Sequence, residues 1–268
     1  MSTNDTFEIQ RLNELVQRRR EGGISRRTFF KAASALGLSV PLATAFERGT
    51  FAALQDAPDG QLNIAMQRVL VSLDPHGAQS VEEPTAVIAT HIFGTLLTRD
   101  GETGELVPSL ATDWSAEGST WTFNLREGVT WQDGTPFTSA DVQNSLQRVI
   151  DLEGPLASLW APVTEIGTPD DLTVTITTSE PLGTVPASAT LLFITPAAGT
   201  NEDGFFDNPV GLGPYQFSSW ERDSQIELVA SDTYWGEAPS VGTLVFRDIP
   251  ETAAKATAIE TGEIDFTW

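Results

Sequence analysis

The residues of this sequence that could do chemistry are its carboxylates and its tryptophans. Paired acidic residues such as Asp170-Asp171 and Glu82-Glu83 could act as general acid and base. In a chain with 37 acidic residues, however, such pairs arise by chance. A glycosidase also needs two carboxylates that the fold places on either side of one bond, which a sequence does not show. We therefore interpret the acidic pairs as solvated surface.

The catalytic motifs that a sequence can reveal are not found. No Gly-x-Ser-x-Gly and no Walker-type loop occurs. The weak Gly211-Leu212-Gly213 motif is followed by Pro214, which lacks the N–H that a phosphate cradle needs, so we predict a turn feeding a strand. The chain has no cysteine and only two histidines, which excludes disulfides, thiolate sites and a histidine-rich metal site. We expect no cofactor and no resident metal.

Aromatic side chains are the other candidates for a ligand site, because tryptophan is an economical way to line a cleft. The chain has seven tryptophans. We assign Trp121, Trp131 and Trp220 to core packing. For Trp160 and Trp268 the choice between core and cleft stays open.

The charge of the chain excludes one class of partner. Its net charge is −22, and the first 45 residues hold seven basic and four acidic residues. The rest therefore has 8 basic and 33 acidic residues, a net charge of −25. So acidic a body repels phosphate backbones, and we exclude nucleic acid as a partner. Self-repulsion also favours a soluble monomer, and it suggests adaptation to a salty environment as a hypothesis beside general acidity.

The N-terminal region resembles a twin-arginine export signal. Arg26 and Arg27 are followed by two phenylalanines and a lysine, then by a mildly apolar stretch that ends in an Ala-x-Ala sequence at residue 45. That stretch is too short to predict a membrane span. The resemblance implies the twin-arginine export machinery as a partner and a periplasmic or extracellular location, with membrane association if the signal stays uncleaved. The alternative is a basic amphipathic helix at residues 9–20 that runs into a buried helix.

Periodicity predicts a mixture of strands and helices after a linker at residues 46–58. Alternating apolar residues predict strands near residues 62–66, 121–125, 172–176, 226–230 and 244–246. Helical spacing predicts helices that begin at Glu83-Pro84 and run towards Leu96, at the capping-box-like Thr138 to Asp141, and after Pro250 until Gly262. Because strands and helices do not alternate strictly, we predict a mixed α/β (α+β) fold.

Several segments, in order along the chain, resemble one known family. They are Leu73-Asp74-Pro75-His76, residues 91–97, Val107 to Trp114, Trp121 to Val129, Trp131 to Val142, Gly213-Pro214-Tyr215, Tyr234-Trp235-Gly236 and Gly262 to Asp265. Together they resemble the N-terminal part of extracellular solute-binding proteins of family 5, which serve peptide, oligopeptide and nickel importers of the ABC type. Leu212 departs from the family, which usually has Thr or Ser between these glycines.

The resemblance implies a periplasmic-binding-protein-like type II fold with three lobes. Lobe I would comprise residues 59–96 and 169–268, and lobe II residues 97–168, after the extension and signal at residues 1–45. The closing lobe III and the return of the chain to lobe I would be missing, so we expect the sequence to be a partial one.

The resemblance also implies a function and a site. The protein would bind a peptide or similar small solute between lobes I and III, deliver it to ABC permease subunits, and have no enzymatic activity. By correspondence with the family, the ligand contacts would be Gln79, Ser80, Val81, Glu82, Trp160, Phe266 and Trp268. The alternatives are a secreted carbohydrate-active hydrolase, motivated by the tryptophans and carboxylates, and a structural surface domain.

Overall fold

The computed structural model describes residues 60–267, all of which belong to the second of two units into which the chain divides after Pro58. The strands are β1 (Gln61–Met66), β2 (Gly94–Thr95), β3 (Leu97–Arg99), β4 (Leu106–Pro108), β5 (Ala111–Glu117), β6 (Thr120–Leu125), β7 (Val163–Asp170), β8 (Thr173–Thr178), β9 (Phe193–Ile194), β10 (Tyr215–Glu221), β11 (Gln225–Ala230), β12 (Thr243–Asp248) and β13 (Phe266–Thr267). The helices are α5 (Glu83–Ile92), α6 (Ser139–Asp151), α7 (Val185–Ser188) and α8 (Thr252–Glu260), with short 3₁₀ turns at Ala157–Leu159 and Phe205–Asp207.

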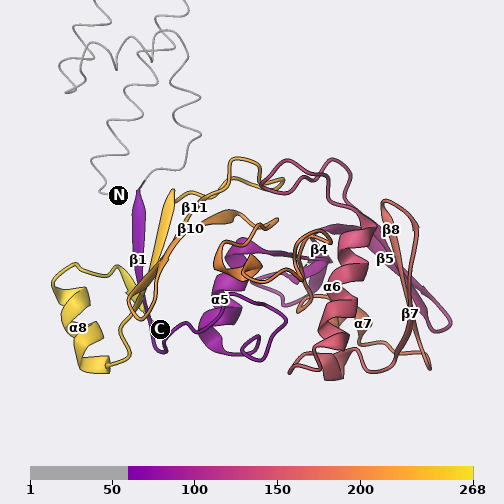
Figure 1. Cartoon of the computed structure of the whole chain (residues 1–268), viewed down its shortest axis with the longest axis horizontal. Coiled ribbons are helices and arrows are strands. Elements are labelled where there is room, and N and C mark those ends of the chain that lie inside the picture. Colours follow the sequence, from indigo (N-terminus) through magenta and orange to yellow (C-terminus); the bar gives the residue numbers. More distant parts are fainter. Residues whose placement is uncertain (1–59, 268) are drawn as a thin grey trace, which may run out of the picture. The chain divides into compact units, whose positions relative to one another are not determined.

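The first sheet has five strands in the order β10-β11-β12-β1-β13, and β1 lies between its two parallel neighbours (Figure 1). β12 and β13 both run parallel to β1, whereas β10 and β11 are antiparallel to their neighbours. Alternating side chains of β1 point to opposite faces, as the period of a strand requires. Ile64 packs in one core with Ile88 and Ile92 of α5, and Ala65 packs with Ala258 of α8 on the other face.

A second, antiparallel sheet has the order β5-β6-β8-β7, and α6 lies against its β7 and β8 strands (Figure 1). α6 begins at a capping box, since the backbone N–H of Thr138 donates to the Asp141 carboxylate at 2.8 Å. Its buried residues Val142, Leu146 and Val149 share one face and join Phe123, Val174 and other strand residues in a core separate from that of the first sheet.

Segments from both halves of the chain join the two sheets. β2, which follows α5, pairs with β9, which comes after the second sheet. Gly211 and Gly213 lie directly on the end of α5: a Cβ on either would overlap the carbonyl oxygen of Ile92 or His91, and the Gly213 N–H donates to the Ile92 oxygen at 2.8 Å. The predicted turn at residues 211–214 is confirmed, because strand β10 follows it at Tyr215.

The structure confirms the predicted strands and helices and corrects two details. The first helix ends at Ile92, not near Leu96, because Phe93 is extended and the next two residues form β2, which pairs with β9. The boundary predicted after residue 168 falls inside β7, and β8, the strand after it, still belongs to the second sheet. Sequence periodicity could not reveal this, because it does not tell which strands pair.

Candidate ligand-binding site

The carboxyl ends of β1, β12 and β13 lie at one edge of the first sheet, because these three strands are parallel. Open α/β sheets bind ligands outside the carboxyl ends of their strands. The segment at that edge is the loop of residues 67–82, which follows β1 and leads into α5. We call it the β1–α5 loop.

Four predicted contact residues lie together at the end of the β1–α5 loop. Two turns shape this end: the Ser80 N–H donates to the Gly77 oxygen at 3.1 Å, and the Glu82 N–H donates to the Gln79 oxygen at 2.9 Å. Val81 is 56% exposed and Glu82 is exposed, whereas Gln79 is half-buried and Ser80 is buried. The Ser80 hydroxyl makes no hydrogen bond to any residue between 60 and 267. The loop thus presents an apolar side chain and a carboxylate to solvent.

The Glu82 carboxylate is paired with Arg68, which begins the same loop. The Arg68 Nη1–Glu82 Oε2 distance is 2.8 Å, and both side chains are largely exposed. Exposed ion pairs contribute only about 0–1 kcal/mol, because water solvates the separated charges well. A ligand with charged groups could therefore exchange partners with this pair at little cost.

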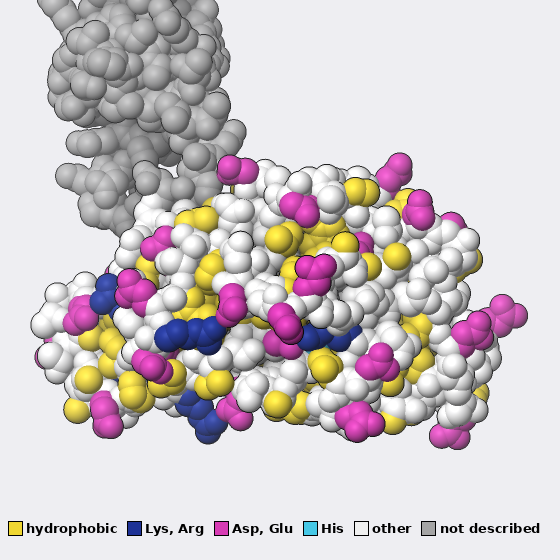
Figure 2. Space-filling view, viewed as in Figure 1, with side chains coloured by type: hydrophobic (Ala, Val, Ile, Leu, Met, Phe, Trp, Pro, Cys, Tyr) yellow, Lys and Arg dark blue, Asp and Glu magenta, His cyan; other side chains and the backbone are white. Residues whose placement is uncertain are grey.

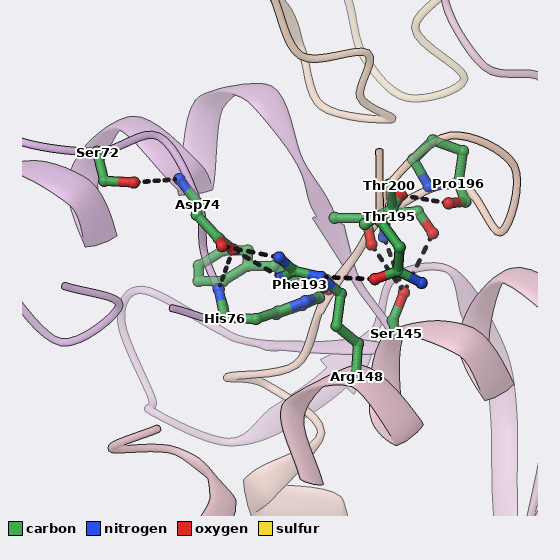
Figure 3. A network of polar contacts seen from close by, with 10 residues as sticks. Ser72, Asp74, His76, Ser145, Arg148, Phe193, Thr195, Pro196 and Thr200 are labelled. Carbon is green, nitrogen blue, oxygen red and sulfur yellow. Dashed lines mark hydrogen bonds and ion pairs between the residues drawn. The ribbon is translucent and has the colours of Figure 1, made fainter. Parts of the chain in front are cut away.

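The middle of the β1–α5 loop is fixed by a buried ion pair that Figure 3 shows. Arg148, from α6, donates from Nη1 and Nη2 to the two Asp74 carboxylate oxygens, each at 2.8 Å. The side chains are only 10% and 19% exposed. Arg148 also donates from Nε to Asn201 Oδ1 at 3.2 Å, and its guanidinium lies 4.9 Å from the ring centre of Phe206. Burial raises the pKa of Asp74, but the Arg148 hydrogen bonds, the His76 N–H and the guanidinium charge outweigh it, and the net pKa is lowered.

His76 ties the same loop to β9 (Figure 3). Its Nε2 lies 2.7 Å from the Phe193 carbonyl oxygen, and because a carbonyl only accepts, Nε2 carries the proton. Burial is the largest cause that lowers the His76 pKa, to about 4; the Phe193 carbonyl opposes it and the Arg148 charge adds to it. The imidazole is therefore neutral at pH 7, and Nδ1 has no hydrogen-bond partner among the described residues.

Phe266, the predicted contact on β13, lies on the α5 side of the sheet. Its ring is 52% exposed at the side of a hollow of about 610 Å³, and the other residues that line the hollow are Leu62, Ile64, Val87, His91 and Phe246. Almost all of these side chains are apolar. His91 is packed there against Tyr215 and Phe246, with ring centres 5.8 and 5.4 Å away. Phe266 lies on β13, which pairs with β1, the strand that leads into the β1–α5 loop.

The remaining predicted residues lie elsewhere. Trp160 is 2% exposed in the core of the second sheet, so in this structure it packs and presents no face to a ligand. Trp131 belongs to the same core, and Trp121 and Trp220 are partly buried against the two cores, as predicted. Trp268, Arg26 and Arg27 lie outside the described residues.

Sequence reasoning missed Arg148. It lies on a predicted helix, but nothing in its spacing from Asp74 indicates that the two side chains meet. Among residues 60–267, no group of three or more His, Asp or Glu side chains is placed to hold a metal ion. In the same part of the chain, no helix is both long and apolar enough to cross a membrane.

The two sheets, the short β2–β9 connection and the loop at the carboxyl edge define a periplasmic-binding-protein-like fold of type II. A sequence model described as bacterial extracellular solute-binding proteins, family 5, middle region, matches residues 105–268. The chain therefore belongs to family 5 of the bacterial extracellular solute-binding proteins.

Individual relatives and structures agree with this assignment. The glutathione-binding protein GsiB of Pectobacterium atrosepticum is 30% identical over 76% of this chain, and the periplasmic oligopeptide-binding protein OppA of Escherichia coli is 30% identical over 82%. The murein tripeptide binding protein MppA of Escherichia coli shares the fold, with a TM-score of 0.72 at 24% identity over 78% of this chain and 46% of its own. A nickel ABC transporter structure from Bacillus halodurans gives a TM-score of 0.68 at 29% identity, over 78% of this chain and 43% of its own.

The chain spans about half the length of the curated relatives it matches: 41% of GsiB and 46% of OppA.

Proposed function

We propose that this protein is the extracytoplasmic substrate-binding component of an ABC importer and binds a peptide or a similar small solute. The observation that carries the proposal is the family match over residues 105–268. Relatives named for binding glutathione, oligopeptides and dipeptides support a peptide-like ligand. The partners of this protein would be the permease subunits of the importer.

The two sheets correspond to two lobes in this proposal. The bounds expected from the sequence put residues 59–96 and 169–268 in lobe I and residues 97–168 in lobe II. Because β8 pairs with β6 and β7, we move β8 from lobe I to lobe II. Lobe I supplies one wall of the cleft, and a third lobe would supply the other. Hinge closure around the solute would then exclude water, so that a few backbone and apolar contacts suffice to hold a flexible ligand.

The contacts on lobe I would be Gln79, Ser80, Val81, Glu82 and Phe266. Val81 and Phe266 are more than half exposed and would lose that apolar surface to the ligand. Glu82 and Arg68 would take up a ligand's ammonium and carboxylate groups, since their mutual ion pair is exposed and weak. Trp268 is a further proposed contact from the sequence, while Trp160 would have to leave its core to become one.

A binding role without chemical turnover fits the family, whose members are solute-binding proteins. No comparison favours the hydrolase alternative. Export through the twin-arginine route at Arg26 and Arg27, to the periplasm or beyond, completes the proposal. The relative OppA of Escherichia coli is named as a periplasmic protein, which supports such a location.

Calorimetric titration of the full product of the reading frame tests the proposal. Tri-alanine, glutathione and the nickel–histidine complex serve as probes, and maltohexaose serves as the control for the carbohydrate alternative. We expect saturable one-site binding of a peptide probe, with the probe recovered unchanged. Hydrolysis of any probe without an added partner would contradict the binding role.

A further inference from the structure

The β1–α5 loop bears the proposed ligand contacts, yet one of its two anchors, Arg148, belongs to lobe II. Asp74 is held by Arg148 of α6, and His76 is held by the Phe193 carbonyl of β9. We call these two attachments, Asp74–Arg148 and His76–Phe193, the loop clasp.

The ion pair of the clasp has the geometry of a rigid attachment. Two parallel hydrogen bonds of 2.8 Å join a planar guanidinium to a planar carboxylate, which fixes orientation as well as distance. Asn201 and the Phe206 ring hold the guanidinium from other sides. Because both side chains are mostly buried, loss of either partner leaves an uncompensated charge, so the pair opposes any movement of the loop away from α6.

The Asp74 carboxylate passes this constraint on to the proposed contact residues. It accepts the His76 backbone N–H at 3.0 Å, which closes a turn over residues 74–76. Gly77 follows so closely that a Cβ there would lie 3.1 Å from Asp74 Oδ2, and the Gly77 carbonyl oxygen accepts the Ser80 N–H. On the side of lobe II, Gly154 lies so close to the loop that a Cβ would come within 2.9 Å of the His76 oxygen. A continuous set of contacts therefore runs from Arg148 to Ser80.

We propose that Arg148, acting through Asp74, is a positioning residue that holds residues 77–82 in the ligand-binding conformation. The predicted effect on ligand binding rests on the proposed function. The predicted effect on the order of the loop does not. A protein whose competent loop is populated only in part binds its ligand more weakly, by the inverse of that fraction. The clasp would thus make the affinity for the ligand depend on how lobe II packs against lobe I, although Arg148 lies outside the β1–α5 loop.

The test uses the full product of the reading frame with Arg148→Met, Asp74→Asn and the double variant. Hydrogen exchange of the Ser80 and Glu82 amides reports loop order without any ligand, and titration with tri-alanine reports affinity. We expect roughly tenfold or more faster exchange and a comparably raised apparent Kd in each single variant, with the double variant no worse than Arg148→Met. The matched control is Arg247→Met, which removes the more exposed pair with Glu263 and should change both quantities less than about twofold.

Arg148→Lys guards against a variant that fails to fold. It keeps the buried positive charge but not the two-pronged geometry, so we expect a folded protein with intermediate exchange at Ser80 and Glu82. Unchanged exchange at these amides in folded Arg148→Lys and Asp74→Asn variants would overturn the clasp. If the unaltered protein bound no probe while the variants still loosened the loop, the proposed function would fail and the clasp would stand.

Discussion

The burial of His76 makes the stability of the protein depend on pH. Its imidazole is fully buried, it donates to a backbone carbonyl, and it lies near the Arg148 guanidinium. Protonation of this ring in the folded state therefore places a second positive charge, beside that of Arg148, in a buried environment. The result is a group whose pKa is about 4 in the folded protein and 6.5 when it is unfolded.

This difference predicts a pH window for stability. Below pH 6.5 His76 binds a proton in the unfolded chain but stays neutral in the folded protein. The free energy of unfolding therefore falls as the pH falls from about 6.5 to about 4. Between pH 7 and pH 5 the loss from His76 is about 2 kcal/mol. The lowered pKa of Asp74 acts only below its ordinary value of 3.8, outside this window.

Urea unfolding at pH 7 and pH 5 measures the effect. In His76→Gln the loss between the two pH values should shrink by about 2 kcal/mol, because glutamine does not titrate. His91→Gln serves as a comparison away from the clasp, where His91 packs against Tyr215 and Phe246. Burial also lowers the pKa of His91, so this variant should reduce the pH dependence as well, and the double variant should reduce it further. An identical pH dependence in His76→Gln and the unaltered protein would refute the assignment of a buried neutral ring.

At the scale of elements, the end of α5 depends on a close approach of two backbones. Gly211 lies against the Ile92 carbonyl, where no side chain fits, and the Gly213 N–H donates to that same oxygen. We predict that Gly211→Ala lowers the free energy of unfolding by at least about 1 kcal/mol, because the added methyl group forces the two segments apart.

Gly183→Ala gives the comparison for this prediction. Gly183 has no heavy atom within 4 Å of a built Cβ and no positive φ, so alanine should leave stability unchanged or raise it slightly. Chemical denaturation of both variants decides the matter. Equal stability of Gly211→Ala and Gly183→Ala would show that the segments can separate freely.

The elements that sequence could predict are those with local signals. The α6 start was predictable from Thr138 and Asp141, whose capping box needs only residues three apart, and β12 from alternating Leu244 and Phe246. The parallel pairing of β12 with β1 was not predictable, because partners nearly two hundred residues apart leave no periodic trace. Val81 was proposed as a contact only through the family resemblance, which local patterns do not supply. Arg148 was not predictable, because it meets Asp74 only in the folded chain.

At the scale of the whole molecule, charge is the dominant property. Figure 2 shows Asp and Glu side chains spread over the visible face with few Lys or Arg between them. The net charge of the chain is −22. Such a surface repels itself, and the repulsion reaches about 30 Å at 0.01 M salt but only about 3 Å at 1 M.

The thermal midpoint should therefore rise when NaCl is raised from about 0.01 M to 1 M. Scanning calorimetry of the protein at fixed pH measures it, and sucrose of matched osmolality controls for general solute exclusion. A flat or falling midpoint would remove the hypothesis of salt adaptation and leave general acidity as the interpretation.

The central claim is that the β1–α5 loop and its sheet form one wall of a cleft that closes on a solute and leaves it unaltered. Titration calorimetry of the full product with tri-alanine, at several temperatures, tests this claim most directly. The account predicts a single saturable site, a negative heat-capacity change from apolar burial, and recovery of intact peptide. Absence of binding to every peptide-like probe, or release of free alanine from the bound peptide, would contradict it.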